Sequence, residues 1–370
     1  MEQLFFEILR VAIGAQDKLS RVPSEKEWGD VYKMAKKQSL VGICFSGVHR
    51  LSEQSCEVSD VHVALGELNK TLYINWLGVA AKIQQRNDIM NRQCVELQKR
   101  LREDGIDSYV LKGQGVAAAY HNLALLRQPG DIDLFVDFGM DRALEYMRKV
   151  APTNEINHKH VQLHVFNDTE VELHYIPAEL HCPWQNRHLQ AFFTKWNGKK
   201  VVQVADEQEI VVPCDEFQVV HLLVHAYRHL FGDGIGLRQV MDLYFVMKSL
   251  PTDLDYDAIK KVVHASGMTQ FASAMMWVLN YVFGFGVMEM LWQPNPRDGQ
   301  FLLSEIMKTG NFGHYDERFD KKGETRRKRF WRVTKGNWRL KRFSIWEAIC
   351  TPLWRIWHFC WMRFHGYTQG

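Results

Sequence analysis

The sequence lacks the cysteine patterns of both disulfide frameworks and zinc ribbons. Its cysteines are odd in number and form no CxxC pair: Cys44, Cys56, Cys94, Cys182, Cys214, Cys350 and Cys360. Structural disulfides belong to oxidising compartments, so this usage fits reduced thiols in a cytoplasm. The first sixteen residues carry Glu2, Glu7 and Arg10 within an apolar stretch, which is a poor composition for a signal peptide. We therefore expect a cytoplasmic protein.

Long apolar runs without charge are also scarce. Only the segment 265–288 is long enough to span a bilayer without an Asp, Glu, Lys or Arg. It contains Ser, Thr, Gln and Asn side chains and has Gly284 and Gly286 near its end, so we predict a buried helix rather than a membrane span. Internal repeats and low-complexity linkers are absent as well, which excludes solenoids and bead-like arrays.

Acidic residues are scarce in one region of the chain. Residues 326–365 hold eleven basic residues and a single acid, Glu347, whereas the rest of the chain has 35 basic and 42 acidic residues. The composition changes near Lys321. A mildly acidic body therefore carries a basic tail, 326–370, which is also rich in Trp and Phe.

The end of this tail has the composition of an interfacial helix. The stretch "TPLWRIWHFCWMRF" predicts a helix with Thr351 as N-cap and Pro352 at its first position. Arg355, His358 and Met362 then share one face. A Trp-rich helix behind a basic segment is typical of anionic membrane surfaces. Binding to single-stranded RNA, which we consider less favoured, and simple packing against the body remain alternatives.

The rest of the chain divides into three regions by pattern. Residues 1–104 predict helices, with Ser24 as an N-cap and a long helix over 65–102 that Gly105 ends. Residues 105–214 alternate between strand and helix patterns, and residues 215–325 are helical again. We expect an α+β fold, in which a mixed-sheet core is flanked by N-terminal and C-terminal helical regions.

The core region contains several short strand patterns. Alternating or apolar runs predict strands at 107–113, 132–137, 160–166 and 171–175, with a further hairpin at 199–213. The pair at 160–175 turns through Asn167 and Asp168, which predicts a hairpin.

Two acids interrupt the apolar strand at 132–137. Asp131 and Asp133 are two residues apart, so they project to the same face of a strand. Carboxylates this close repel each other unless a cation lies between them, and Mg²⁺ (or Mn²⁺) is the usual one. Glu172, with His174 on the same face of a later strand, offers a third ligand. We predict a metal site made by Asp131, Asp133 and Glu172.

A phosphate site is predicted opposite these acids. In "VLKGQG" a strand runs through Lys112, Gly113 and Gln114 into a helix, so backbone N–H groups face an anion. Lys112 or Arg127 supplies positive charge. A metal beside a phosphate cradle suits nucleotidyl transfer from a nucleoside triphosphate.

These residues resemble a known superfamily. The order Leu111-Lys112-Gly113, Tyr120, Arg127, "DIDLFV" and Glu172-Leu173-His174 is similar to nucleotidyltransferases with the DNA polymerase beta-like fold, and closest to a bacterial branch of uncharacterised members. The resemblance covers about residues 20 to 290. It implies that Asp131, Asp133 and Glu172 are catalytic and bind metal, and that Gly113 lines the phosphate site. The branch also carries a histidine-bearing helix followed by Arg and Asp, here His221, His225, Arg238 and Asp242. We expect the cleft to be lined by His174, His225, Arg238 and Asp242.

One departure from the superfamily keeps other functions open. A serine usually follows the glycine of the phosphate turn, but here Gln114 does. A catalytically inactive nucleotide-binding protein is therefore one alternative to an enzyme with an unknown acceptor hydroxyl. A toxin-type enzyme that modifies RNA or protein is another.

Several residues also have plainer interpretations. In these interpretations Glu172 pairs with Lys112 or Arg127, and Arg238 pairs with Asp242 four residues later on one helix. The remaining histidines near the hairpin lack metal-ligand spacing and are interpreted as surface or fold residues: His158, His160, His164, His181 and His188.

Overall fold

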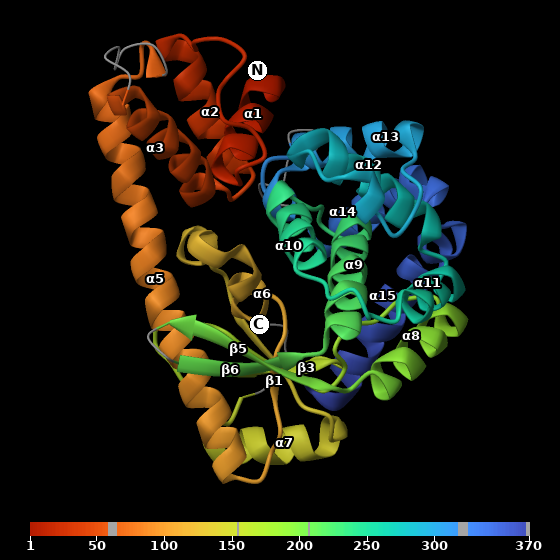
Figure 1. The fold of residues 1–370 in the computed structure, drawn as a ribbon. Coiled ribbons are helices and arrows are strands. Elements are labelled where there is room, and N and C mark those ends of the chain that lie inside the picture. The colour runs from red at the N-terminus through yellow and green to blue at the C-terminus, as the bar shows by residue number, and fades with distance from the viewer. Residues whose placement is uncertain (58–64, 154, 206–207, 317–324, 368–370) are drawn as a thin grey trace.

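The protein is a helical molecule built around one small mixed sheet (Figure 1). A computed structural model describes residues 1–57, 65–153, 155–205, 208–316 and 325–367. Its α-helices are α1 Glu2–Ala12, α2 Glu25–Lys37, α3 Val41–Glu57, α5 Lys70–Glu103, α6 Gln114–Ala117, α7 Gly139–Val150, α8 Pro183–Lys195, α9 Asp215–Phe231, α10 Leu237–Lys248, α11 Tyr256–Ala265, α12 Thr269–Phe283, α13 Pro296–Thr309, α14 Arg326–Arg339 and α15 Ile345–His365.

The sheet joins strands of both directions. Its order is β1-β2-β4-β3, with β2 and β4 parallel and the other two pairings antiparallel. A separate hairpin pairs β5 with β6. The strands are β1 Tyr109–Val110, β2 Ile132–Phe135, β3 His160–Leu163, β4 Val171–His174, β5 Lys199–Ala205 and β6 Gln208–Pro213. The mixed α+β fold and both predicted hairpins are confirmed.

Two hydrophobic cores support these elements. Side chains of β2, β3 and β4 pack with α7 and the second half of α5, while the first half of α5 packs with the other helices. The long α5 therefore contributes to both cores, and Figure 1 shows it along one side of the molecule. The predicted division into regions at residues 104, 214 and 325 stays a prediction.

The helix ends follow local signals. Ser24 caps α2 and forms a reciprocal capping box with Glu27, as its sequence predicts. The charge-free segment 265–288 contains α12, whose Phe271, Met275 and Val282 are fully buried, so the prediction of a buried helix is confirmed. None of the helices in the described ranges is both long and apolar enough to cross a membrane.

The last helix begins earlier than the sequence predicts. Ser344 is its N-cap and accepts a hydrogen bond from the Glu347 N–H at 3.1 Å, so α15 starts at Ile345 and Pro352 lies inside it. The prediction of Thr351 as N-cap is therefore wrong. Proline removes one backbone donor from a helix interior, but Thr351 is held by His181 at 2.9 Å and Glu347 fixes the first turn. The compositional change near Lys321 lies outside the described residues.

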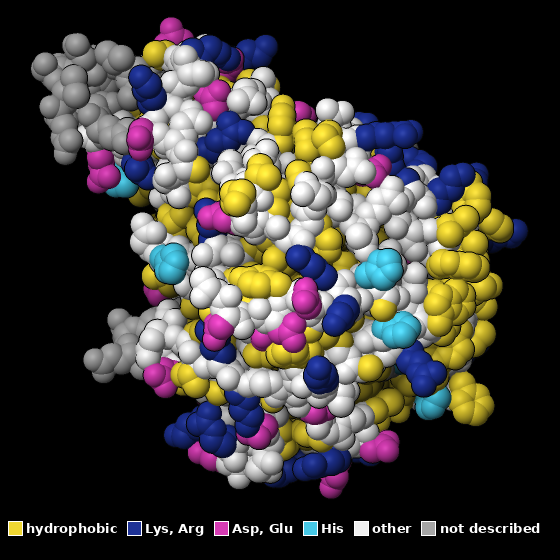
Figure 2. Space-filling view, turned by 45° about the vertical axis from the view of Figure 1, so that its right-hand side comes forward, with side chains coloured by type: hydrophobic (Ala, Val, Ile, Leu, Met, Phe, Trp, Pro, Cys, Tyr) yellow, Lys and Arg dark blue, Asp and Glu magenta, His cyan; other side chains and the backbone are white. Residues whose placement is uncertain are grey.

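Hydrophobic side chains are unevenly distributed over the surface. Figure 2 shows them gathered along the right-hand edge of one face, with Lys and Arg side chains above and below. Many large exposed apolar residues belong to α15, among them Leu353, Ile356 and Phe364.

Glu347 anchors α15 to the body. Its carboxylate is fully buried and accepts hydrogen bonds from the backbone N–H groups of His181 at 3.0 Å and Cys182 at 3.2 Å. Arg228 of α9 donates to it at 2.7 Å. One acid of the basic tail therefore holds the tail helix against two other segments.

We expect Glu347→Ala to lower the free energy of unfolding by about 3–5 kcal/mol, since it leaves Arg228 and two backbone donors without their buried partner. Urea unfolding followed by tryptophan fluorescence measures the loss. The matched control is Glu145→Ala on the exposed face of α7, for which little change is expected. Equal effects of the two substitutions would contradict the anchoring role.

Candidate active site

Strands β2 and β4 bring three carboxylates together. Their parallel register places Asp133 beside Glu172, while Asp131 directly precedes β2. One oxygen from each of Asp131, Asp133 and Glu172 lies within 4.8 Å of the others. Ile132 and Leu134 are buried on the opposite side of the strand. The structure thus assembles an acidic cluster that can hold a metal ion.

Lys112 lies between the two aspartates. Its Nζ is 2.7 Å from Asp133 Oδ2 and 3.4 Å from Asp131 Oδ2. Burial opposes the charge of Lys112, but Asp131 and Asp133 raise its pKa above the ordinary value. Burial likewise opposes ionisation of Asp133, yet Lys112 and His174 hold the pKa of that carboxyl well below its usual range. The lysine is therefore charged and the aspartate ionised.

His174 joins the acids on β2 and β4. Its buried Nε2 shares a hydrogen bond between Asp133 Oδ1 at 2.8 Å and Glu172 Oε2 at 3.0 Å. Burial lowers its pKa, but these two bonds raise the pKa above the ordinary value. The neighbours of Glu172 are thus histidines rather than the Arg127 that one interpretation suggested.

His160 also belongs to this site, although its spacing gave no sign of it. It lies opposite His174 in the antiparallel β3–β4 pairing, and its Nδ1 is 3.2 Å from Glu172 Oε2. The interpretation of His160 as a mere surface or fold residue is therefore corrected. The register of the predicted hairpin is the signal that pairs it with His174. His160, Glu172 and His174 form a second group with metal-ligand distances.

These side chains open into a cavity of about 330 Å³. Its polar wall includes Lys112, Asp131, Asp133, Lys159, His160, Glu172, His174, Glu179, His221, His225, Arg228, His229 and Asp233. Burial lowers the pKa of His221 to about 4 and that of His229 to about 3, and it places the pKa of His225 well below the ordinary value. The histidines of α9 therefore form a neutral wall opposite the charged cluster.

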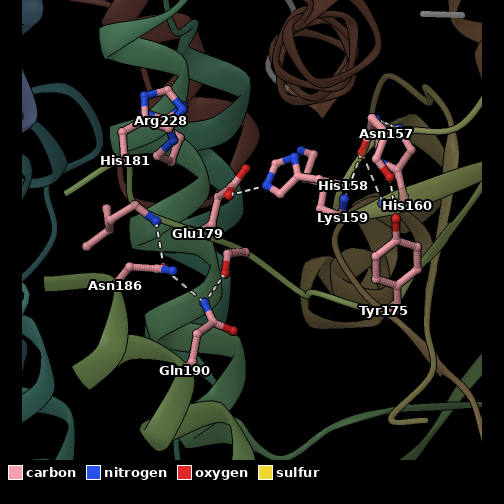
Figure 3. Close-up of polar contacts among 12 residues, drawn as sticks. Asn157, His158, Lys159, His160, Tyr175, Glu179, His181, Asn186, Gln190 and Arg228 are labelled. Atoms are coloured by element: carbon pink, nitrogen blue, oxygen red, sulfur yellow. Dashed lines mark hydrogen bonds and ion pairs between the residues drawn. The ribbon is translucent and has the colours of Figure 1, made fainter. Parts of the chain in front are cut away.

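A short loop forms the rim of the cavity. Asn157 Oδ1 accepts hydrogen bonds from the N–H groups of Lys159 and His160, each at 3.0 Å, which fixes the turn before β3 (Figure 3). Figure 3 also shows His158 paired with Glu179. Trp354 of α15 packs edge-on against His158, with ring centroids 5.0 Å apart, and lines the cavity. Sequence reasoning assigned none of these rim residues to the site.

Two predicted nucleotide-binding side chains lie elsewhere. Gln114 is buried and donates to Asn91 Oδ1 at 2.6 Å and Asn87 Oδ1 at 3.3 Å, because α5 supplies two amide acceptors. Arg127 is buried against Asp242, with Nε–Oδ1 at 2.7 Å and Nη2–Oδ2 at 2.8 Å. Neither side chain lines the cavity.

Arg238 and Asp242 bind different residues of the segment that precedes β2. The main partner of Asp242 is Arg127, and the Tyr120 hydroxyl donates to its Oδ1 at 2.6 Å. Arg238 donates from Nη1 to the Gln128 carbonyl at 3.1 Å. The expected pair between Arg238 and Asp242 is thus replaced by two contacts from α10, which position the loop leading into Asp131.

Comparison with known proteins identifies the family. The model of a family described as uncharacterised nucleotidyltransferase matches residues 24–284. A search of curated proteins finds no match. A crystal structure of an antigenic nucleotidyltransferase-like protein from Paracoccidioides brasiliensis is similar at 14% identity and a TM-score of 0.33, covering 48% of this chain and 86% of that one. On the extent of the family match, the chain belongs to the uncharacterised nucleotidyltransferase family.

Proposed function

We propose that the protein is a metal-dependent nucleotidyltransferase of the DNA polymerase beta-like superfamily. It transfers a nucleoside monophosphate from a nucleoside triphosphate to the hydroxyl of an acceptor that stays unknown. The observation that carries the proposal is the cluster of Asp131, Asp133 and Glu172, all within 4.8 Å, at one cavity. A cytoplasmic location is part of the proposal, supported by free thiols at the cysteines that the structure describes.

The donor atoms fit a hard divalent cation. Asp131, Asp133 and Glu172 offer carboxylate oxygens, which suit Mg²⁺ or Mn²⁺. Such an ion, when bound, lowers the pKa of the attacking hydroxyl and neutralises charge on the leaving pyrophosphate. The nearby His160 nitrogen adds a donor that Mn²⁺ accepts more readily than Mg²⁺. His174 keeps its Nε2 proton toward Asp133 and Glu172 and orients those acids.

The chain's own groups then bind and orient the reactants. Lys112 exchanges its contact with Asp131 for the triphosphate, where its charge offsets that of the phosphates. Gly113 has φ +65°, a conformation that favours glycine, and it directs the turn beside Asp131. The acceptor oxygen forms a bond to the α-phosphorus as the bond to the bridging oxygen breaks. Pyrophosphate leaves, and Glu172 takes the hydroxyl proton.

Calorimetric titration with each of the four ribonucleoside triphosphates, with and without Mg²⁺ or Mn²⁺, tests the proposal. We expect metal-dependent binding of at least one triphosphate, because the carboxylates repel its phosphates unless a cation intervenes. If none of the four triphosphates binds in the presence of either metal, the proposal is contradicted.

One observation favours a second function. Lys112 already neutralises Asp133 at 2.7 Å, and Gln114 replaces the usual serine of the turn with a side chain buried against α5. A catalytically inactive protein that binds nucleotide without turnover has both features. It predicts triphosphate binding that does not depend on metal and yields no pyrophosphate. Transfer of labelled nucleotide to total RNA or to protein would instead indicate the toxin-type alternative.

A further inference from the structure

Helix α15 buries several polar side chains and exposes most of its large apolar ones. The side that faces the body carries polar residues, namely the buried Glu347, Thr351 and His358 and the half-buried Arg355, together with the smaller or flexible apolar residues Ala348, Cys350 and Met362. The side that faces outward carries large apolar residues that are exposed: Ile345, Trp346, Ile349, Leu353, Ile356, Trp357, Phe359 and Phe364. A helix in water normally buries its apolar side. A contiguous apolar surface of this kind marks an interaction site.

A basic groove runs beside this apolar surface. A cavity of about 850 Å³ between α14 and α15 is lined by Arg327, Arg329, Arg355 and Arg363, together with Phe330, Trp354, Phe359 and Tyr367 among its aromatic residues. Burial and the neighbouring charge of Arg329 lower the pKa of Arg355. Arg329 also pairs with Asp233 at 3.2 Å, but the like charges that crowd around the open groove still favour an anion between them. Exposed Lys328 and Lys335 extend the positive charge along α14, and exposed Lys341 extends it into the turn that follows.

We propose that α14 and α15 form a docking surface for an anionic phospholipid bilayer. The apolar side of α15 enters the interface between headgroups and acyl chains, and the arginines of the groove contact lipid phosphates. This proposal goes beyond the nucleotidyltransferase function and does not depend on it. Because Trp354 on the opposite side of α15 lines the candidate active site, docking holds that cavity about one helix diameter, 10–12 Å, from the headgroups.

Charge and side-chain type favour lipid over the other occupants. A second copy of the chain would bring the same basic residues to the interface, and like charges repel there. Single-stranded RNA binds by stacking its bases on aromatic rings. The outward surface of α15 includes Ile345, Ile349, Leu353 and Ile356, which offer no ring for stacking. Aliphatic and aromatic residues combined with basic ones are the composition of an interfacial helix.

Vesicle co-sedimentation of the full chain tests the proposal. Wild type is compared with Leu353→Ser/Ile356→Ser/Phe364→Ser on vesicles of phosphatidylcholine with phosphatidylglycerol and on vesicles of phosphatidylcholine alone. The matched control is Ile74→Ser/Val201→Ser/Met288→Ser. Its side chains are 64%, 56% and 97% exposed, against 63%, 52% and 88% for the α15 set. Since all six residues are exposed, both variants are expected to fold, which circular dichroism checks.

We expect wild type and the control to bind the anionic vesicles, with weaker binding at high salt. The α15 variant should lose at least about tenfold in partitioning, because it removes three apolar side chains from the interface. Its nucleotide binding should stay at the wild-type level, which separates this result from the proposed function. Absence of wild-type binding to anionic vesicles, or equal loss in both variants, overturns the proposal. The proposal is also overturned if wild type dimerises with rising concentration, or binds RNA, and the α15 variant alone loses that property while its vesicle binding stays intact.

Discussion

Asp131→Asn/Asp133→Asn should reduce nucleotide transfer by about 1,000-fold or more, and circular dichroism checks that the protein stays folded when Lys112 loses the charge of its buried partner Asp133. The substitution keeps the shape of both side chains and removes the two charges that would hold the cation. A metal that stabilises transition-state charge contributes several kcal/mol, and each 1.4 kcal/mol corresponds to a tenfold rate change. Release of pyrophosphate from the triphosphate that binds best, with a hydroxyl acceptor identified by screening, measures the rate.

A matched control separates the loss of the site from a general effect of lost charge. Asp137 follows β2 on the same segment, is exposed, and accepts a hydrogen bond from Asn197 at 2.6 Å outside the cavity. Asp137→Asn should therefore retain activity within about twofold, as is usual for surface substitutions. Retained transfer by the double variant would show that Asp131 and Asp133 do not bind the catalytic metal.

Local sequence patterns predicted the parts of the site that depend on single strands. The two-residue period of a strand placed Asp131 and Asp133 on one face of 132–137 and its entrance, and Glu172 and His174 on one face of 171–175. The parallel pairing of β2 with β4 sets these faces side by side. The metal-binding role of the three acids is still a prediction. The period of two residues within each strand can be read from a single sequence, whereas the pairing of the two strands cannot.

Contacts between distant segments could not be predicted in this way. Trp354 reaches the cavity because Glu347 binds the backbone at His181 and Cys182, more than 160 residues away in the chain. Gln114 turns toward α5 because Asn87 and Asn91 offer acceptors there. Such choices depend on which buried polar groups find partners after the elements pack, and no local spacing encodes them.

Arg127 is the clearest case of a contact that local patterns did not predict. The sequence suggested that it binds phosphate, yet its guanidinium forms two bonds with Asp242, both side chains being about 95% buried. The charge of Asp242 raises the pKa of Arg127 although burial opposes it. The pair links the segment before β2 to α10, and Tyr120 adds a third hydrogen bond. It therefore fixes the loop from which Asp131 projects.

We expect Asp242→Ala to lower the free energy of unfolding by about 3–5 kcal/mol, because Arg127 is left charged in a buried site. Arg127→Met/Asp242→Leu removes both charges and fills the space, so it should recover most of that stability. Urea unfolding followed by tryptophan fluorescence compares the two. If the double variant keeps its fold and still binds triphosphate at the wild-type level, Arg127 acts through structure alone. A loss of triphosphate affinity in a stable double variant would instead restore a direct role for Arg127 at the phosphates.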